Sequence, residues 1–434
     1  MLVRLSGAGR LVAGLSVAGL VLAPTTGAPA LAADPSASPA SVAAGTPVAS
    51  APSGAVLTMH QDDLDAALSA TIGKAALAAY DEISAPGLIV GIETADGRWI
   101  GTIGTQDWGP GGSPGSIPMT PDVLQRIGSI TKTFTVTALL QAVERGDLSL
   151  DEPIGDFVLG TPNPDATLGQ LAAMRSGIPS YTFDQEFQDW IFGDPIAAWM
   201  PNQLVDIIRG KPADFAPGTQ TAYSNTNTVL LGMALEAATG TPLPQLIDDG
   251  IITSLGLAHT TFPLDQQFAE PHAHGYTLQG QEPGTIADAT DWNPSWGWAA
   301  GAMTSSLEDL FTYGKALVSG EGLLGKETQA ARLDSFDFSI PPNSPSRAYG
   351  LGLGLSNGWY GHTGELPGYN TVLQRHPEAG ITLVVMANSD IKAGDCPADA
   401  PALPGGPKAG PCEDPAVHVA NAVSEALGLP LVAG

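Results

Sequence analysis

Three short motifs place a candidate nucleophile, a cation and a phenol in one chain. Ser129-Ile-Thr-Lys132 sets a hydroxyl and an ammonium three residues apart, so both side chains would share one face of a helix. Tyr223-Ser-Asn225 supplies a phenol that can move protons, and His362-Thr-Gly364 supplies a strand-like segment that ends in a glycine. Together these residue types predict acyl transfer through a covalent serine intermediate.

Each residue of the set has an expected chemical role. Ser129 follows Gly128 where a loop gives way to a helix, and the N–H groups at a helix start favour a developing alkoxide. A partly buried Lys132 would lose its proton more readily and act as base. Tyr223, near that cation, is expected to ionise below its usual pKa of about 10 and to relay protons. Asn225 is expected to orient Lys132 and to hydrogen-bond a substrate amide.

Less specific interpretations of the same residues remain open. Taken alone, Ser129 and Lys132 are also typical of a helix cap and a solvated cation. Tyr223 could be a packed loop residue, and His362 a surface residue of a hairpin. The spacing of the first motif recurs at Ser389-Asp-Ile-Lys392, which runs into a Gly- and Pro-rich loop rather than a helix.

Metal chemistry is not expected. The other histidines, including His272 and His274, form no further ligand cluster in the sequence, so we expect neither a metal nor a cofactor.

The elements that must position these residues change in type along the chain. Apolar periodicity predicts a helix near the start of the chain, a second from Ser129 to Gly146, and several more through the middle. Between about 147 and 290 the sequence shows little strand signal. A capping box at Ser305 predicts one more helix, through Leu317. The further expected helices are 61–80, 168–174, 203–208, 228–239 and 416–427, and the expected strands are 87–93, 99–103, 349–355, 370–374 and 380–386.

Strands at both ends and helices between them predict an α+β fold with an α/β sandwich lobe. Its antiparallel sheet would be built from both chain ends and flanked by helices, with a largely α-helical inserted lobe. We expect one catalytic domain over 56–434. Its α/β lobe would comprise about 56–135 and 290–434, and its helical lobe about 136–289. A substrate cleft commonly lies where two such lobes meet.

The first residues are typical of an export signal. Arg4 and Arg10 precede an apolar run, and Ala30-Leu-Ala32 fits the cleavage rule, so we interpret 1–32 as a signal peptide and the protein as secreted, without a stable membrane anchor. An N-terminal core helix is the alternative. Residues 33–55 are poor in apolar side chains and predict a disordered linker.

Composition narrows the partners. The chain has 17 Lys and Arg against 44 Asp and Glu, a formal net charge of −27, which makes nucleic acid an unfavourable partner. Its two cysteines, Cys396 and Cys412, flank a stretch rich in Pro, Gly and Ala, and in an exported chain they predict a disulfide; two free thiols are the alternative.

Several motifs, taken in order, resemble the serine penicillin-recognising family of D-alanyl-D-alanine carboxypeptidases, class C β-lactamases and β-lactamase-fold carboxylesterases. The resemblance implies a β-lactamase/transpeptidase-like fold and assigns roles to matching positions. Ser129 would attack the carbonyl, and Lys132 and Tyr223 would share proton transfer. The likeness rests on Arg126 to Lys132, Leu148 to Pro153, Arg175 to Gly177, Tyr223 to Asn227, Tyr349 to Gly352 and His362 to Gly364.

The resemblance also assigns residues to binding. The N–H groups of Ser129 and Glu365 would form the oxyanion hole, where each donor contributes roughly 3 kcal/mol in the transition state. Thr363 would help to hold a substrate carboxylate, and Gly364 would let a substrate backbone approach closely. Trp296 or Trp298 would line the cleft.

Departures from the family pattern bear on the substrate. His362 stands where β-lactamases of this fold carry Lys and where carboxypeptidases more often carry His. An Arg that some carboxypeptidases place after Tyr-Gly-Leu-Gly is replaced by Gly354-Leu-Ser356, and Met174-Arg175 replaces the usual His-Thr.

We therefore expect a D-alanyl-D-alanine carboxypeptidase-like hydrolase that acts on peptidoglycan stem peptides. The alternatives are an esterase or β-lactamase, and a non-catalytic penicillin- or cell-wall-binding protein. The partners would be a small peptide, ester or β-lactam substrate, and peptidoglycan.

Overall fold

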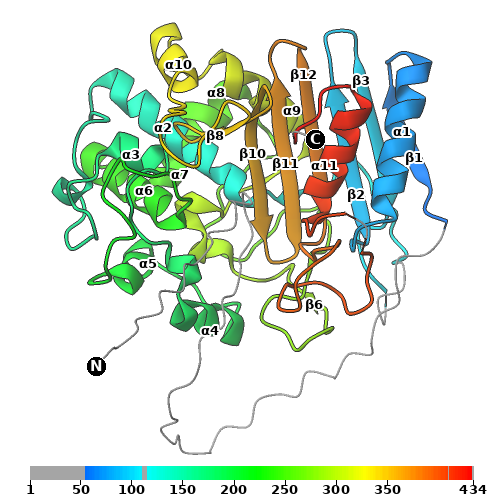
Figure 1. Ribbon diagram of the computed structural model, residues 1–434, viewed down its shortest axis with the longest axis horizontal. Helices are drawn as coiled ribbons and strands as arrows, with labels where there is room; N and C mark the ends of the chain where they lie inside the picture. Colours follow the sequence, from blue (N-terminus) through cyan, green and yellow to red (C-terminus); the bar gives the residue numbers. More distant parts are fainter. Residues whose placement is uncertain (1–53, 110–114, 409, 433–434) are drawn as a thin grey trace, which may run out of the picture.

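An eight-stranded antiparallel sheet forms the centre of the molecule. The computed structural model describes residues 54–109, 115–408 and 410–432. The strand order is β1-β3-β2-β12-β11-β10-β9-β8, so β2 from the start of the chain pairs with β12 from its end. Figure 1 shows these strands side by side with helices packed over them. The predicted α+β fold, with a sheet built from both chain ends, is confirmed.

The strands of this sheet are β1 (Leu57–Asp62), β2 (Gly87–Glu93), β3 (Arg98–Gly104), β8 (Arg347–Tyr349), β9 (Gly354–Ser356), β10 (Trp359–Leu366), β11 (Tyr369–His376) and β12 (Ile381–Ala387). Two small ribbons pair β4 (Gln125–Arg126) with β7 (Thr304–Ser305) and β5 (Tyr276–Thr277) with β6 (Ala287–Asp288).

Helices cover both faces of the sheet because its central strands are apolar on both sides. Every residue of β2 is buried, as a strand between two helical layers requires. On one face α1 (Ala66–Tyr80) packs beside α11 (Pro415–Ala426), and their apolar residues share a core with Trp99 and Trp359. On the other face α9 (Leu307–Ser319) contacts β11 and β12. Removing either tryptophan side chain would cost about 3–5 kcal/mol.

Most other helices lie between β3 and β8. The second apolar core joins them to the sheet through α2 (Thr131–Arg145), which packs against α6 (Asn225–Thr239). Figure 1 shows this helical region beside the β8 edge of the sheet. The remaining helices are α3 (Leu168–Ala172), α4 (Gln185–Gly193), α5 (Pro201–Ile208), α7 (Leu243–Ile247), α8 (Thr253–Leu255) and α10 (Lys326–Leu333).

Two element predictions were wrong in detail. Ser305 does not cap the helix: it pairs with Gln125 in the β4–β7 ribbon, so the cap passes to Ser306, whose Oγ accepts from Asp309 N. The single strand expected over 349–355 is instead β8 and β9 with a turn between them. Gly352 has a φ of +64° in that turn, and a Cβ there would lie 2.4 Å from Val136 of α2. The chain therefore turns tightly over α2 rather than running straight.

The predicted signal peptide (1–32) and nearly all of the predicted linker (33–55) lie outside the described residues. Within the described part of the chain, no helix combines the length and apolar character that a bilayer span requires.

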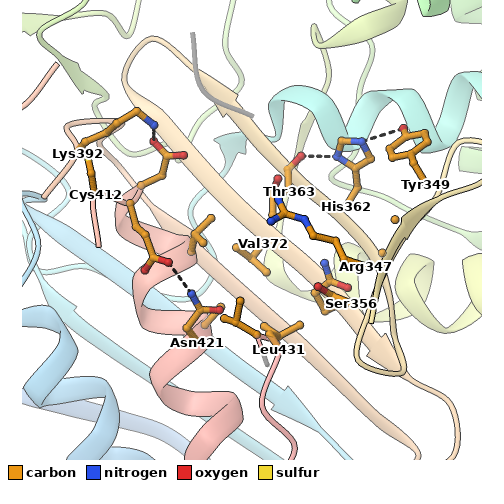
Figure 2. A pocket seen from close by; sticks show the side chains of 18 of the residues that line it. Arg347, Tyr349, Ser356, His362, Thr363, Val372, Lys392, Cys412, Asn421 and Leu431 are labelled. Carbon is orange, nitrogen blue, oxygen red and sulfur yellow. Dashed lines mark hydrogen bonds and ion pairs between the residues drawn. The ribbon is translucent and has the colours of Figure 1, made fainter. Parts of the chain in front are cut away.

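A cross-linked loop joins β12 to α11. Cys396 and Cys412 form a disulfide there, with their Cα atoms 4.6 Å apart. Lys392 forms an ion pair with Asp414 just before α11, and both side chains are largely buried. Figure 2 shows this pair above α11, and below it the hydrogen bond that Asn421 of the helix donates to Glu413. These contacts order a segment that has little apolar surface of its own.

His418 links this loop to α1, and its charge is expected to make folding pH-dependent. Its Nδ1 and Nε2 lie 3.3 Å and 3.0 Å from carboxylate oxygens of Glu413 and Glu82. The hydrogen bond to Glu413, together with that to Glu82, raises the pKa of His418 above its ordinary value despite partial burial. The stabilisation is therefore complete below the unfolded-state pKa and is lost as pH rises through the higher folded-state pKa.

We predict that His418→Gln lowers the melting temperature at pH 5.5 and changes it much less at pH 8.5. Thermal unfolding of both proteins at the two pH values measures this difference. His259→Gln, at an exposed site, is the control. An equal fall in melting temperature at both pH values would mean that the charge of His418 contributes nothing to stability.

Candidate active site

Ser129 lies on a single 3₁₀ turn, Gly128–Ile130, that leads directly into α2. The predicted helix is confirmed at both ends, since Gly146 caps α2 with a φ of 78°. The turn packs tightly against β10: a Cβ on Gly128 would lie 2.5 Å from the backbone N of Glu365. Gly128 itself has a φ of +49°, so a glycine suits this position in both space and conformation.

Lys132 is fully buried in the first turn of α2. Its Nζ lies 2.9 Å from Ser129 Oγ and donates to the carbonyl oxygen of Ala300 at 2.6 Å. Burial holds the pKa of Lys132 well below its ordinary value. A neutral amine can donate an N–H to Ala300 while its lone pair accepts the hydroxyl proton of Ser129. Lys132 is therefore placed to act as the base.

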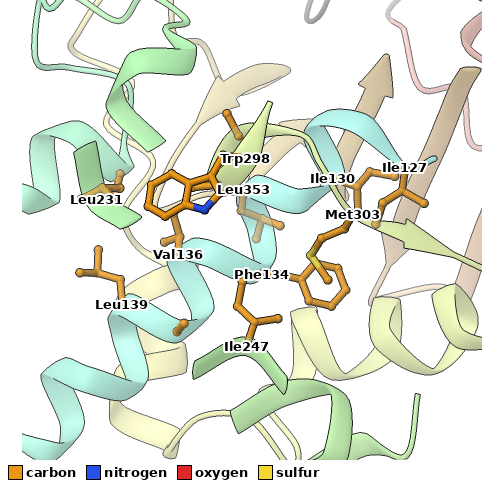
Figure 3. Close-up of a cluster of buried hydrophobic side chains, with 14 of the residues drawn as sticks. Ile127, Ile130, Phe134, Val136, Leu139, Leu231, Ile247, Trp298, Met303 and Leu353 are labelled. Carbon is orange, nitrogen blue, oxygen red and sulfur yellow. The ribbon is translucent and has the colours of Figure 1, made fainter. Parts of the chain in front are cut away.

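The apolar surroundings of α2 keep this amine away from water. Figure 3 shows Phe134, Val136 and Leu139 of α2 packed among side chains from distant segments, Trp298 among them. Trp298 has a φ of +34° and packs on α6, where a Cβ on Gly232 would lie 2.8 Å from its ring. This contact fixes the 3₁₀ turn Trp298–Ala300, and hence the carbonyl that holds Lys132.

Of the two tryptophans expected at the cleft, Trp298 is instead a buried core residue. Trp296 is half-buried, and its carbonyl oxygen accepts a hydrogen bond from Tyr181 Oη at 2.6 Å, so its place at the cleft stays a prediction. Ala300 was not predicted at all, because a backbone carbonyl leaves no mark on residue type.

Tyr223 comes close to Lys132 and Ser129 from the segment before α6. Lys132 Nζ lies 5.0 Å from the centre of its ring. The expectation that Tyr223 ionises readily is wrong: burial raises its pKa well above the ordinary value, and a contact with the Ser129 hydroxyl offsets this only in part. Its Oη is buried without a partner of good hydrogen-bond geometry among the described residues. Tyr223 is therefore a neutral phenol, suited to donating a proton.

Asn225 does not orient Lys132. Its side-chain amide donates to Thr182 Oγ1 at 3.0 Å, and its backbone N donates to Ser180 Oγ at 3.1 Å. It begins α6 rather than preceding it, so its side chain is drawn towards that neighbouring loop. The hydrogen bond expected from Asn225 to Lys132 is made by Ala300 instead.

His362 is buried on β10 and is held as a neutral ring. Burial and the nearby Lys132 lower its pKa to about 3. Its Nδ1 faces the carbonyl of Thr363 and so carries the proton, which leaves Nε2 to accept from Tyr349 Oη at 3.0 Å. Figure 2 shows both bonds. The ring centre lies 6.0 Å from that of Tyr223, so His362 supports Tyr223 sterically and does not act as a cation.

Tyr349 was part of the motif that carried the resemblance, yet the sequence indicated no role for it. Its ring packs edge-on against Tyr223 at 6.1 Å, and its hydroxyl bonds to His362. It therefore fixes the position of both rings.

Gly364 serves the protein's own backbone, whereas the sequence predicted that a substrate would approach it. A Cβ at this position would lie 1.9 Å from the carbonyl oxygen of Ile127 and 3.2 Å from Ser129 N. The Gly128–Ile130 turn and β10 are thus in direct contact through two glycines. This contact brings the backbone N–H groups of Ser129 and Glu365 near one another, as an oxyanion hole requires.

The side chain of Glu365 belongs to a cluster of charges beside the site. Burial, with Asp414 nearby, raises its pKa well above the ordinary value, while Lys392 and a hydrogen bond from Gln279 at 3.0 Å act in the opposite sense. Lys392 is thus an ion-pair partner within this cluster. Because Lys392 is paired with Asp414 and not with Ser389, the other serine with this spacing, these two residues do not form a second nucleophile–base pair among the described residues.

Thr363 lies on β10 next to an open strand edge. β9 pairs with β10 only from Trp359 to Gly361, which leaves the following residues unpaired on that side. The Oγ1 of Thr363 is buried and has no hydrogen-bond partner among the described residues. A substrate that lies along this edge could bond to both the backbone and this hydroxyl.

The arrangement has the parts that acyl transfer needs. Ser129 Oγ can lose its proton to Lys132 as it attacks a carbonyl, and two N–H groups can bind the oxygen that becomes negative. Tyr223 can protonate the departing atom. Among the eight residues predicted to be catalytic or substrate-binding, Asn225 does not make its expected bond to Lys132, because its side-chain amide donates to Thr182.

The pH dependence of acylation tests the role of Lys132. We predict that kcat/KM for an activated ester rises with pH through a midpoint well below the ordinary pKa of lysine, because neutral Lys132 is the reactive form. Lys132→Met should lower kcat/KM by about 10²–10⁴-fold, whereas Lys74→Met, at an exposed site on α1, should not. A midpoint at the ordinary lysine value would contradict this role.

Gly364→Ala tests the contact between β10 and the nucleophile turn. The new methyl group overlaps the Ile127 carbonyl, so we predict a destabilisation of about 1–3 kcal/mol in urea unfolding, with loss of acylation. Gly193→Ala is the matched control, since a Cβ there meets no atom within 4 Å. Full activity in Gly364→Ala would show that the contact is not needed.

Comparison with known proteins agrees with this geometry. The family model described as Beta-lactamase matches residues 75–403, which is more than half of the chain. "Protein flp" of Staphylococcus aureus (strain MW2) is 27% identical over 281 residues, covering 63% of this chain and 54% of that protein. The "Putative penicillin-binding protein PbpX" of Bacillus subtilis (strain 168) is 27% identical, covering 60% of each. The chain thus spans little more than half the length of these curated relatives.

Solved structures extend the likeness. A D-stereospecific amidohydrolase from Streptomyces sp. aligns with a TM-score of 0.66 and 32% identity, over 74% of this chain and 94% of that one. D-amino acid amidase from Ochrobactrum anthropi SV3 aligns with a TM-score of 0.64 and 25% identity, over 83% and 97%. The protein belongs to the Beta-lactamase family, the group of serine hydrolases with the β-lactamase and penicillin-binding-protein fold.

Proposed function

We propose that the protein is an exported serine hydrolase of the D-alanyl-D-alanine carboxypeptidase type, which cleaves an amide bond on the carboxyl side of a D-residue in peptidoglycan stem peptides. The observation that carries the proposal is the 2.9 Å contact between Ser129 Oγ and a fully buried Lys132 that has Ala300 as its other hydrogen-bond partner.

In the acylation step, Ser129 Oγ bonds to the substrate carbonyl carbon while its proton passes to Lys132. The carbonyl oxygen takes the negative charge and is bound by the N–H groups of Ser129 and Glu365. The amide C–N bond then breaks, and the leaving nitrogen takes a proton from the Tyr223 hydroxyl. Tyr223 regains a proton from Lys132, which took it from Ser129. Water hydrolyses the acyl-enzyme by the same groups in reverse.

The relatives support a D-configured acyl group. Two solved structures similar to this chain are those of a D-stereospecific amidohydrolase and a D-amino acid amidase. A curated relative is named as a putative penicillin-binding protein. Hydrolysis of small D-amino acid amides is therefore the second candidate, favoured by the 32% identity to the amidohydrolase.

Export is part of the proposal and rests on residues 1–32. Their positive start, apolar run and small-residue cleavage site are the support, and processing at Ala32 would be its direct sign.

Intact-mass time courses test the function. We predict that the protein gains the mass of one penicillin, that this adduct maps to Ser129, and that a D-Ala-D-Ala peptide is hydrolysed while its L-Ala-L-Ala counterpart is not. Ser129→Ala should abolish both reactions, because the nucleophile is removed, whereas Ser389→Ala should retain them.

Three results would overturn the proposal. Activity retained in Ser129→Ala would exclude this nucleophile. Cleavage of simple esters without any D-peptide or D-amide hydrolysis would favour the esterase alternative, and a permanent adduct without turnover of any substrate would favour a binding protein.

A further inference from the structure

The peptide that joins Gly364 to Glu365 carries one of the two N–H groups expected in the oxyanion hole. Its other polar atom, the carbonyl oxygen of Gly364, accepts a hydrogen bond from Asn370 Nδ2 at 3.0 Å. In a planar trans peptide the C=O and the N–H point in opposite directions. A hydrogen bond that fixes the Gly364 carbonyl therefore also sets the direction of the Glu365 N–H.

Asn370 lies on β11, opposite Glu365 in the register of the sheet, and its side chain is completely buried. Its Oδ1 accepts a hydrogen bond from the backbone N of Ala416 at 2.8 Å, so both halves of the side-chain amide are used. A backbone N–H can only donate and a backbone carbonyl can only accept, so these two partners fix which way the amide is turned. The side chain thus acts on the protein backbone and not on a substrate.

The partner Ala416 lies in the first turn of α11, which packs over β11 and β12 (Figure 1). The first N–H groups of a helix have no acceptor within the helix. Here Pro415 begins the helix without an N–H, and the side chain of Asp414 makes no capping hydrogen bond. Asn370 supplies the acceptor instead. The aligned peptides of α11 also give this end of the helix a partial positive charge, which lies next to the Asn370 amide.

Three amide groups are therefore arranged head to tail. The N–H of Ala416 donates to the side-chain amide of Asn370, and that amide donates to the Gly364 carbonyl. The same peptide ends in the Glu365 N–H. Buried hydrogen bonds in such a chain polarise one another, so each bond makes the next N–H a stronger donor. The last N–H of the chain is the one expected to bind the negative oxygen.

The side chain of Glu365 is held from another direction. Gln279 Nε2 donates to Glu365 Oε1 at 3.0 Å and also to the carboxylate of Asp390. Asp390 in turn accepts from the backbone N of Gly368 at 3.2 Å, in the turn between β10 and β11. Together with the bond from Asn370, these contacts leave the Glu365 N–H little freedom to turn away.

We propose that Asn370 is a positioning residue for the oxyanion hole, which aligns and polarises the Gly364–Glu365 peptide and links it to the start of α11. The inference rests on the acyl-transfer chemistry of the proposed function, because an oxyanion forms only if Ser129 attacks a carbonyl. It does not depend on which acyl group the substrate carries. Ser129 and Lys132 make no contact with Asn370, so its loss should slow the step in which the oxygen becomes negative.

Asn370→Leu tests this role, because it keeps the size of the side chain and removes both hydrogen bonds. We predict that kcat/KM for a p-nitrophenyl ester falls about 10- to 100-fold, less than the roughly 10²–10³-fold loss expected when a donor of the hole is removed outright. Affinity for phenylboronic acid, which bonds to Ser129 and sets an oxygen in the hole, should fall by a similar factor. Binding of the intact ester to a Ser129→Ala background should change less than about threefold, because the hole acts on the transition state.

Asn388→Leu is the matched control. Asn388 is also completely buried, and its side chain likewise accepts from a backbone N, that of Gly87, and donates to a backbone carbonyl, that of Gln106. It should lower the melting temperature, as Asn370→Leu does, and leave kcat/KM and phenylboronic acid affinity unaltered. Equal losses of activity in the two variants would overturn the assignment, as would an unchanged phenylboronic acid affinity in Asn370→Leu.

A measurement on the unaltered protein covers the case in which Asn370→Leu does not fold. When phenylboronic acid binds, the amide protons of Glu365 and of the Asn370 side chain should both move downfield in the NMR spectrum, because the bonds of the chain strengthen together. A shift of the Glu365 proton alone would contradict the proposal. A parent protein that forms no adduct with phenylboronic acid and hydrolyses neither esters nor D-peptides would instead refute the proposed function.

Discussion

The contact between Ser129 and the fully buried Lys132 is the constraint on which the rest of the site depends. A lysine ammonium buried without a carboxylate is costly, and the group avoids that cost by giving up its proton. The fold meets this condition with apolar residues along α2 and with a single carbonyl, from Ala300, that holds the amine in place. The same residues that build the core therefore set the reactivity of the nucleophile.

Two glycines allow the turn that carries Ser129 to pack directly against the sheet. Gly128 and Gly364 let the nucleophile turn and β10 touch through their backbones, at distances that no side chain would allow. One consequence is that the N–H groups of Ser129 and Glu365, which belong to segments far apart in the sequence, lie near one another. A third segment, the one before α6, places Tyr223 close to Ser129 and Lys132. Substrate would bind where these three segments converge.

Much of this arrangement was predictable from local patterns. Ser129 and Lys132 are three residues apart on one helix, so their proximity follows from helix geometry alone. The central strands and the long helices were found because their apolar residues repeat with the period of each element. Tyr223 and His362 are far away in sequence and were found only through the order of the motifs.

What could not be predicted depends on tertiary contacts. The carbonyl of Ala300 carries no side-chain signal, and Asn225 is drawn away by Thr182, which lies in a loop that the sequence does not place. The pKa of Tyr223 was expected to fall because a cation is near, but burial raises that pKa and also keeps Lys132 neutral.

The most direct test of the account is a measurement of the protonation of Lys132 in the free enzyme. Lysine side chains labelled with ¹³C at Cε can be titrated by NMR, and the Lys132 signal is assigned by its loss in Lys132→Met. The account predicts a titration midpoint well below that of the exposed lysines, so that the amine is neutral over the pH range of activity. A Lys132 signal that titrates together with the exposed lysines would contradict it.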